Sequence, residues 1–314
     1  MKIENKIQEN IPLAHMTTFK IGGSAKFFIV IKTKEELIST FNWAKEHKEK
    51  VYILGGGSNL LISDKGVNGL VIKFENTEVT VKGERIESSA GAQLSQVVSI
   101  ASSHNLTGME WAAGVPGTVG GAIRGNAGCF GSNIEQVLET ANIYIQSKTD
   151  FMTYSKNNCK FTYRDSIFKS DSNLIIWEST FKLKNGSLEE IKRQMNDIIN
   201  IRNRSFPGLP SAGSVFKGLL IDDIKINNPK LAKHLEKHNA VRNGKVGTRW
   251  LIDQLGLKGE KIGGAKISLE HANFIVNTGK ATAKDVITLI NIIKEKVLNQ
   301  YNIQLQEEIQ YFGL

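Results

Sequence analysis

The stretch "GMEWAAGVPGTVGGAIRGNAGCFG", residues 108–131, holds eight of the chain's 29 glycines in 24 positions. Glycine at this density destabilises helices and strands alike, by about 0.5–1 kcal/mol for each interior position. Such a composition indicates backbone conformations, or close approaches to the backbone, that are closed to other residues. The stretch therefore predicts a site whose contacts come largely from the main chain.

A second glycine run occurs earlier, in "YILGGGSNLLIS", residues 52–63. Successive backbone N–H groups in a glycine turn bind anions, phosphate above all. The run is neither a P-loop, because no Lys-Ser/Thr pair follows it, nor a G-x-G-x-x-G turn that opens a helix. Alone, it is compatible with a plain tight turn. Together, the two clusters favour a long ligand with a central pyrophosphate, such as FAD, with a glycine-rich packing seam as the alternative.

Composition limits the classes of function. The chain has 314 residues, of which 40% are hydrophobic and 23% charged, as in a globular protein of two or three domains. The net charge of +9 is compatible with nucleic acid, an anionic membrane surface or a phosphorylated small molecule. Lysines and glutamates alternate in "TKEELISTFNWAKEHKEK", residues 33–50, and no basic-aromatic groove motif is visible. We therefore favour a solvated basic surface, with no nucleic-acid partner.

The apolar run Phe27 to Ile31 is too short to cross a bilayer, and the N-terminus lacks the apolar core of a signal peptide. The two cysteines, Cys129 and Cys159, form neither a disulfide framework nor a metal-ligand set. These features predict a cytoplasmic protein without a membrane or metal partner.

The hydrophobic pattern predicts mixed helices and strands. A strand at 25–32 is followed by a capping box of Thr33 and Glu36, and by a helical stripe. Further predicted elements are a β-rich region at 138–184, helices at 188–204 and 282–302, a lysine-rich loop with a helical patch at 218–246, and a final strand at 303–312.

Several motifs together resemble one family. "GGGSNLLISDKGVNGLVI" (55–72) and "GVPGTVGGAIRGNAGCFG" (114–131) are similar to the flavin-binding segments of the UDP-N-acetylenolpyruvoylglucosamine reductases. The other motifs follow in the family's order and extend the resemblance over nearly the whole chain: "NIPLAHMTTFKIGG" (10–23), "YRDSIFK" (163–169), "PSAGSVFK" (210–217), "LIDQLGLKG" (251–259), "HANFIVN" (271–277) and "LQEEIQYFG" (305–313).

The resemblance implies an α+β fold, with a two-domain FAD-binding module of the vanillyl-alcohol-oxidase type and a C-terminal α/β domain. The expected domains are 1–80 and 81–203 for FAD and 204–314 for the UDP-sugar. It also implies that NADPH reduces FAD, which passes a hydride to UDP-N-acetylglucosamine enolpyruvate and yields UDP-N-acetylmuramate for peptidoglycan. The residues expected at FAD are Gly55, Gly56, Gly57, Ser58, Asn59, Leu60, Gly114, Pro116, Gly117, Thr118, Gly120, Gly121, Asn126, Ala127 and Gly128.

Three positions match the family's catalytic residues. Arg164 is expected to stabilise the enolate-like charge, because preorganised electrostatics usually contributes most to catalysis. Ser214 is expected to donate the proton, and Glu308 to act beside Arg164 on the substrate carboxyl. From the residues alone, a structural salt bridge, a loop hydroxyl and a solvent-exposed glutamate are the respective alternatives. Strand alternation places Glu308 away from the apolar face and Glu307 awkwardly on it.

The candidates for substrate binding are Arg204, Lys217 and His271, although His271 fits equally well as a packed, hydrogen-bonded histidine. The 50 positions between Arg164 and Ser214 (214 − 164) fit the short form of the family, which lacks a tyrosine-bearing loop. Residues 218–246 are longer than the matching stretch that the resemblance leads us to expect, and Gln310 stands where arginine is common. We expect a monomer.

Two rival functions remain open from the sequence. The first is an oxidase or dehydrogenase of a small hydroxy acid or sugar on the same flavin fold, for which a proton-donating serine has no clear use. The second is a non-enzymatic basic protein that binds nucleic acid, for which the paired glycine clusters have no purpose.

Overall fold

The computed structural model describes residues 3–314 and divides the chain into two compact units, which are described separately. Unit 1 contains the residues up to Ile11, Ala25–Gly56 and Asn68–Arg204. Unit 2 contains Pro12–Ser24, Gly57–Val67 and Ser205–Leu314. Two short N-terminal segments therefore fold with the C-terminal part of the chain. Within residues 3–314, no helix combines the length and the apolar character needed to cross a membrane.

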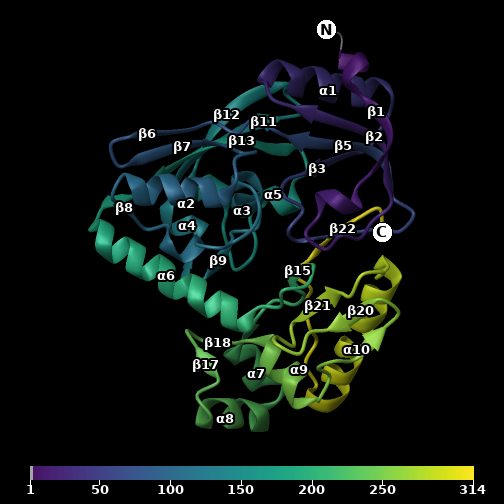
Figure 1. Cartoon of the computed structure of the whole chain (residues 1–314), viewed down its shortest axis with the longest axis vertical. Coiled ribbons are helices and arrows are strands. Elements are labelled where there is room, and N and C mark those ends of the chain that lie inside the picture. The colour runs from purple at the N-terminus through teal and green to yellow at the C-terminus, as the bar shows by residue number, and fades with distance from the viewer. Residues whose placement is uncertain (1–2) are drawn as a thin grey trace. The chain divides into compact units, whose positions relative to one another are not determined.

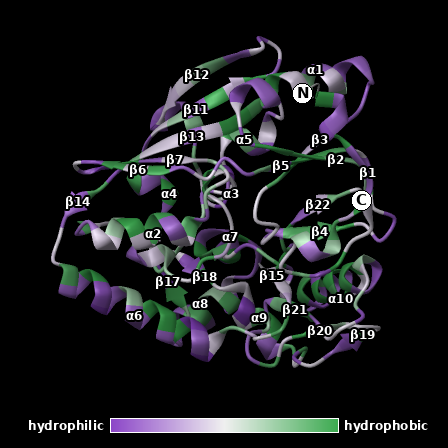
Figure 2. Cartoon of the chain, turned by 45° about the horizontal axis from the view of Figure 1, so that its top comes forward, coloured by the Kyte–Doolittle hydropathy of each residue, from purple (hydrophilic) through white to green (hydrophobic). Residues whose placement is uncertain are grey.

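The first sheet of unit 1 forms around an apolar centre. Its strands, in spatial order, are β1 (Gln8–Pro12), β2 (Ser24–Ile31), β5 (Val67–Phe74) and β3 (Val51–Leu54). The ribbons of β2 and β5 are mainly in the hydrophobic colour (Figure 2), as expected for central strands buried on both faces. Strand β3 pairs with β5 in parallel, and helix α1 (Lys34–Glu46) connects β2 to β3 along the chain.

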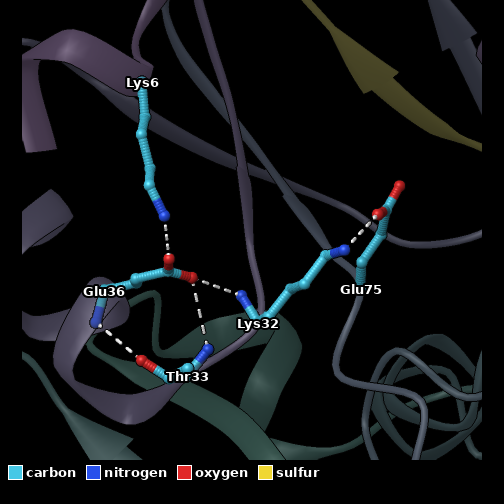
Figure 3. Close-up of polar contacts among 5 residues, drawn as sticks. All are labelled: Lys6, Lys32, Thr33, Glu36 and Glu75. Carbon is cyan, nitrogen blue, oxygen red and sulfur yellow. Dashed lines mark hydrogen bonds and ion pairs between the residues drawn. The ribbon is translucent and has the colours of Figure 1, made fainter. Parts of the chain in front are cut away.

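Helix α1 begins where the sequence predicts it. Figure 3 shows the capping box, in which the Thr33 hydroxyl accepts from the Glu36 N–H at 3.2 Å and the Glu36 carboxylate accepts from the Thr33 N–H at 3.4 Å. The same carboxylate accepts from the Lys32 N–H at 2.7 Å and pairs with the Lys6 ammonium. The capping box satisfies N–H groups that the first turn of a helix otherwise leaves without partners.

The second sheet of unit 1 is antiparallel, in the order β12 (Asp150–Ser155), β11 (Leu138–Ile145), β13 (Leu174–Lys182), β7 (Arg85–Ser89) and β6 (Val79–Lys82). Helices α2 (Leu94–Ser103), α3 (Val119–Arg124) and α4 (Ile134–Val137) lie on one side of it (Figure 1). The unit also contains α5 (Ile167–Ser170), α6 (Leu188–Ser205) and the short pairs β8 (Leu106–Thr107) with β14 (Lys184–Asn185) and β9 (Gly128–Cys129) with β10 (Ser132–Asn133).

The two sheets of unit 1 share one hydrophobic core. Phe41 of α1 packs against Tyr144 of β11, with ring centroids 5.3 Å apart, and Phe74 of β5 packs against Trp177 of β13 at 5.5 Å. The predicted boundary at residues 80/81 falls inside strand β6. The described parts of 1–80 and 81–203 that belong to unit 1 thus share one core, whereas Pro12–Ser24 and Gly57–Val67 belong to unit 2. The separation of 1–80 and 81–203 into two subdomains stays a prediction.

Unit 2 is built on a four-stranded sheet in the order β15 (Ser211–Ser214), β21 (Phe274–Asn277), β20 (Ala265–Ile267) and β19 (Lys261–Ile262). Helices α9 (Thr248–Gln254) and α10 (Ala283–Tyr301) add to its core, and Thr282 and Asp285 form a capping box at the start of α10. Strand β22 (Gln310–Phe312) pairs in parallel with β4 (Leu60–Ile62), and thereby joins the C-terminus to an N-terminal segment.

Two sequence-based expectations for unit 2 are wrong. Residues 218–246, expected to form a loop with a helical patch, instead fold into two helices and a small sheet. These are α7 (Ile221–Asn227), α8 (Pro229–Lys237) and the strands β16 (Leu219–Leu220), β18 (Lys245–Val246) and β17 (Val241–Arg242). Ile224 and Leu235 from the two helices are buried in the unit's core. The final strand covers only 310–312, because residues 303–309 make a single bridge, between Glu307 and Phe216, and no continuous ladder.

Gly57 is the glycine of the first cluster that belongs to unit 2, and both its backbone conformation and its neighbours require glycine there. Its φ is +63°, and a Cβ would lie 2.3 Å from the Met16 carbonyl oxygen. We expect Gly57→Ala to lower the free energy of unfolding by about 2 kcal/mol or more, because left-handed strain and a backbone clash add together. Gly208→Ala is the matched control, since no atom lies within 4 Å of the added Cβ. Equal stability of the two variants in urea denaturation would contradict this account.

Candidate active site

The two glycine clusters meet within unit 1. Gly55 and Gly56 follow strand β3, and a Cβ on Gly56 would lie 2.6 Å from the Cα of Gly117. A Cβ on Gly55 would lie 2.7 Å from the Thr118 hydroxyl, which caps α3 by accepting from the Gly121 N–H at 3.4 Å. The glycines at 55 and 56 are thus required by the packing of one loop on the other. The alternative of a packing seam accounts for these two positions.

Gly121 fits a ligand better than a packing role. It is exposed, and an added Cβ would meet nothing closer than the Thr118 hydroxyl at 3.5 Å, an ordinary contact distance. Protein packing therefore does not require the missing side chain. Its N–H and carbonyl are bonded within α3, so the absent side chain serves to let a bound group approach the main chain closely. Gly114 is also exposed, so part of this second cluster leaves the main chain open to a pyrophosphate. Pro116 is exposed as well, but it has no N–H to donate.

Asn126, Ala127 and Gly128 serve the fold of unit 1. The Asn126 side chain is 2% exposed, donates to the Thr162 carbonyl at 3.0 Å and accepts from the Glu135 N–H at 3.1 Å. A Cβ on Gly128 would lie 2.4 Å from the Ser132 carbonyl oxygen. The polar atoms of Asn126 are thus engaged by the protein, and its predicted contact with FAD stays a prediction.

Arg164 lies at the tip of a tight turn in unit 1. Thr162 and Asp165 close the turn with reciprocal backbone hydrogen bonds of 3.1 and 3.2 Å, and Arg164 itself has a left-handed φ of +57°. Its guanidinium lies 5.5 Å from the centre of the Tyr163 ring. A left-handed arginine costs about 1 kcal/mol or more, and such strain is concentrated at functional sites.

Cys129 links Arg164 to the end of the second glycine cluster. Burial raises the pKa of the Cys129 thiol, and the positive charges of Arg202 and Arg164 oppose that rise. The Arg202 guanidinium donates to the Cys129 sulfur at 3.0 Å. Unit 1 therefore brings the predicted catalytic arginine into electrostatic range of the predicted flavin segment.

Ser214 and Glu308 come from adjoining backbone segments of unit 2. The Glu308 N–H donates to the Val215 carbonyl at 2.7 Å, and the Lys217 N–H donates to the Gln306 carbonyl at 2.9 Å. The residue next to Ser214 is thus bonded directly to Glu308, although the two lie far apart in the sequence. Arg164 belongs to unit 1, so only two of the three predicted catalytic residues share a unit.

Asn273 holds the Ser214 segment in place. Its side chain, which is 6% exposed, accepts from the Phe216 N–H at 3.0 Å and donates to the Phe216 carbonyl at 2.9 Å. Its backbone carbonyl accepts from the Val215 N–H at 2.8 Å. Sequence reasoning did not single out this residue, although it lies within the quoted motif "HANFIVN".

Asn59, expected at FAD, binds the backbone of the Glu308 segment. Its side chain donates to the Glu308 carbonyl at 3.1 Å, and its own carbonyl accepts from the Gln310 N–H at 2.9 Å. The stretch Gly57–Leu60 thus belongs to unit 2, whereas Gly55 and Gly56 belong to unit 1. The first glycine cluster is divided between the units, and any contact of Ser58 or Asn59 with FAD stays a prediction.

The two C-terminal glutamates have different surroundings. Glu307 pairs with the Lys294 ammonium at 2.9 Å and accepts a hydrogen bond from the Tyr311 hydroxyl. Burial raises the pKa of Tyr311, and the Glu307 carboxylate raises it further. The awkward position of Glu307 on an apolar face is explained by these partners. Glu307 is therefore structural, which leaves Glu308 as the catalytic candidate of the pair.

The three predicted substrate residues are not equivalent. Arg204 is exposed near the end of α6 in unit 1, whereas Lys217 and His271 belong to unit 2. The Lys217 backbone is fixed, because its carbonyl accepts from the Thr248 hydroxyl. The His271 ring packs against both Phe274 and Phe206, with centroid distances of 4.7 and 6.0 Å.

His271 is held neutral. Burial lowers its pKa to about 4, and the positive charges of Arg249 and Lys258 act in the same direction. Its Nδ1 atom accepts from the Asn273 N–H at 3.3 Å, which leaves a proton on Nε2. His271 thus matches the packed histidine of the alternative reading, and any contact with substrate would be a neutral hydrogen bond.

Acid is expected to destabilise unit 2 through His271. The unfolded histidine binds its proton near pH 6.5 and the folded one near pH 4, so the unfolded state holds more protons between these values. Stability therefore falls by about 1–3 kcal/mol as the pH decreases through this window. His271→Asn keeps an acceptor for Asn273 and should flatten the pH dependence measured by urea denaturation. An unchanged slope would contradict the assignment.

Comparisons with known proteins define the class. Residues 25–144 match a family described as "FAD binding domain", and residues 204–312 match "UDP-N-acetylenolpyruvoylglucosamine reductase, C-terminal domain". The chain is therefore an FAD-containing oxidoreductase with a separate C-terminal domain, and the predicted fold class is confirmed.

Relatives of nearly full length define the family. The UDP-N-acetylenolpyruvoylglucosamine reductase of Solibacter usitatus is 34% identical over 308 residues, which cover 98% of this chain and 97% of the relative. That of Caldanaerobacter subterraneus is 37% identical over 312 residues, covering 99% and 95%. The crystal structure of the Thermus caldophilus enzyme matches with a TM-score of 0.78 and 31% identity, covering 98% of this chain and 100% of that one. The chain belongs to the UDP-N-acetylenolpyruvoylglucosamine reductase family.

Proposed function

We propose that this enzyme uses NADPH to reduce UDP-N-acetylglucosamine enolpyruvate to UDP-N-acetylmuramate, a step of peptidoglycan precursor synthesis. The observation that carries the proposal is the direct pairing of the Ser214 and Glu308 segments. The proton donor Ser214 and the carboxylate of Glu308 are thus held by paired backbone segments, in a chain that belongs to this reductase family. A serine proton donor fits the reduction of a double bond and has no clear use in the oxidation of an alcohol.

The glycine-rich segments of unit 1 are proposed to hold FAD, with the exposed Gly114 and Gly121 allowing the pyrophosphate to approach the main chain closely. FAD, when bound, supplies the hydride chemistry between NADPH and the enolpyruvyl double bond. The protein's part is to bind and orient the reactants, to exclude water and to manage charge and protons.

Each catalytic candidate has one task in this proposal. The Arg164 guanidinium stabilises the negative charge that spreads into the substrate carboxylate as the hydride arrives on the double bond. The Ser214 hydroxyl gives its proton to the adjacent carbon, which completes the reduction. Glu308 binds the substrate carboxyl group as a hydrogen-bonding or acidic group, and Lys217, Arg204 and neutral His271 are proposed to contact the UDP-sugar.

Product analysis under anaerobic conditions tests the proposal. We expect one UDP-N-acetylmuramate for each NADPH consumed, with no requirement for oxygen. Hydrogen peroxide formed in air from an alcohol substrate, without NADPH, would instead favour the oxidase alternative. A cytoplasmic monomer is part of the proposal, in keeping with free thiols and with NADPH as reductant.

A further inference from the structure

The left-handed backbone conformation of Arg164 has to be stabilised by contacts with the rest of unit 1. The hydrogen bonds around it fix the two ends of its turn: Asn126 donates to the Thr162 carbonyl at 3.0 Å, and the Ser166 hydroxyl donates to the Arg124 carbonyl at 2.7 Å. Neither of these bonds reaches Arg164 itself. Together with the backbone bonds between Thr162 and Asp165, they restrict the turn, but none of these bonds involves the Arg164 carbonyl.

Lys169 makes the contact that the turn needs. Its ammonium donates to the carbonyl oxygen of Arg164 at 2.6 Å, a charge-assisted hydrogen bond with a half-buried donor. The Lys169 N–H bonds to the Ser166 carbonyl at 3.0 Å, so helix α5 directs the side chain back towards the turn. The Asp165 N–H donates to Thr162 at 3.2 Å, and the peptide group between Arg164 and Asp165 is therefore held at both its N–H and its C=O.

We infer that Lys169 is a positioning residue, which fixes the peptide group of Arg164 and thereby the direction of its guanidinium. The reason is geometric, because the orientation of that peptide group and the left-handed φ of Arg164 together set the direction of its Cα–Cβ bond. Without the ammonium, the turn can relax towards the conformations that arginine prefers, and the guanidinium moves. A displacement of about 1 Å at a catalytic group can slow a reaction about 10²-fold.

The inference rests on the proposed function of Arg164. Measuring the two half-reactions separately distinguishes a failure of the inference from a failure of the proposed function. Lys169→Met removes the donor and keeps the length of the side chain. We expect re-oxidation of the reduced flavin by the enolpyruvyl substrate to slow about 10–10²-fold. Flavin reduction by NADPH and the thermal midpoint should stay unchanged, and Lys169→Arg should restore most of the rate. Lys148→Met, an exposed lysine of the same unit, is the control and should leave both rates unchanged.

A double-mutant cycle with Arg164→Lys decides whether Lys169 acts through Arg164. If it does, Lys169→Met adds little in the Arg164→Lys background. An equal slowing in both backgrounds, or an equal loss in both half-reactions together with a lower thermal midpoint, would overturn the inference.

Hydrogen exchange tests the positioning independently of any activity. The Asp165 amide should exchange faster in Lys169→Met and at the wild-type rate in Lys148→Met. Unchanged exchange in both variants would overturn the inference, even if the wild-type enzyme turned out to use another substrate. Failure of the wild-type flavin to react with the enolpyruvyl substrate would contradict the proposed function alone.

Discussion

Ser214→Ala is expected to leave the reduction of the flavin by NADPH intact and to slow its re-oxidation by the enolpyruvyl substrate about 10²–10⁴-fold. That range is typical for removal of a positioned acid. The backbone around Ser214 is held by its pairing with Phe274 and by Asn273, so alanine should leave the fold unchanged. The slower re-oxidation would then result from loss of the proton donor and not from a change in the surrounding backbone. Stopped-flow spectra of the two half-reactions measure it.

Ser211→Ala is the matched control for Ser214→Ala. Ser211 lies in the same strand, and its hydroxyl accepts only a long backbone hydrogen bond, of 3.4 Å, from Gly213. We expect both half-reactions of this variant to proceed at the wild-type rate. If Ser214→Ala slowed the two half-reactions equally, its assignment as proton donor would be wrong.

Glu308→Gln and Glu307→Gln are expected to have opposite effects although the residues are neighbours. Glu308→Gln should slow re-oxidation by substrate about 10²-fold or more, with stability unchanged, because it removes an acidic group that acts on the substrate carboxyl. Glu307→Gln should keep the chemistry and lower the free energy of unfolding by about 1 kcal/mol. It removes the charge that Lys294 and Tyr311 both contact.

The pair forms its own control, since each variant changes one carboxylate to an amide at adjacent positions. Half-reaction rates and urea denaturation of both variants give four results. Loss of turnover in Glu307→Gln with normal rates in Glu308→Gln would reverse the assignment of the catalytic glutamate.

Local signals made much of the fold predictable. The capping boxes at Thr33 and Thr282 depend on residues three positions apart, so the sequence contains everything that they require. The apolar stripes of α1 and α10 are equally local. The glycine clusters were recognisable because their density conflicts with any regular element. The sequence could not reveal that a side chain at Gly55 or Gly56 would clash with Thr118 or Gly117, because this contact forms only in the folded chain.

The contacts that organise the site are distant in sequence and were not predictable from pattern. Asn59 holds the Glu308 carbonyl across 249 positions, and Asn126 holds the Thr162 carbonyl across 36. The role of Glu307 depends on a lysine in another helix, so strand alternation alone left it unexplained. Only a helical patch was predicted within 218–246, because lysines obscure the few apolar residues that its helices bury. Motif spacing identifies candidate residues, whereas their supports come from tertiary structure.

The visible spectrum of the purified enzyme under anaerobic conditions tests the central claim most directly. We expect a yellow protein whose flavin absorbance is bleached by NADPH and returns when UDP-N-acetylglucosamine enolpyruvate is added. A colourless protein that cannot be reconstituted with FAD would contradict the account. So would a bleached flavin that only oxygen, and not the enolpyruvyl substrate, re-oxidises.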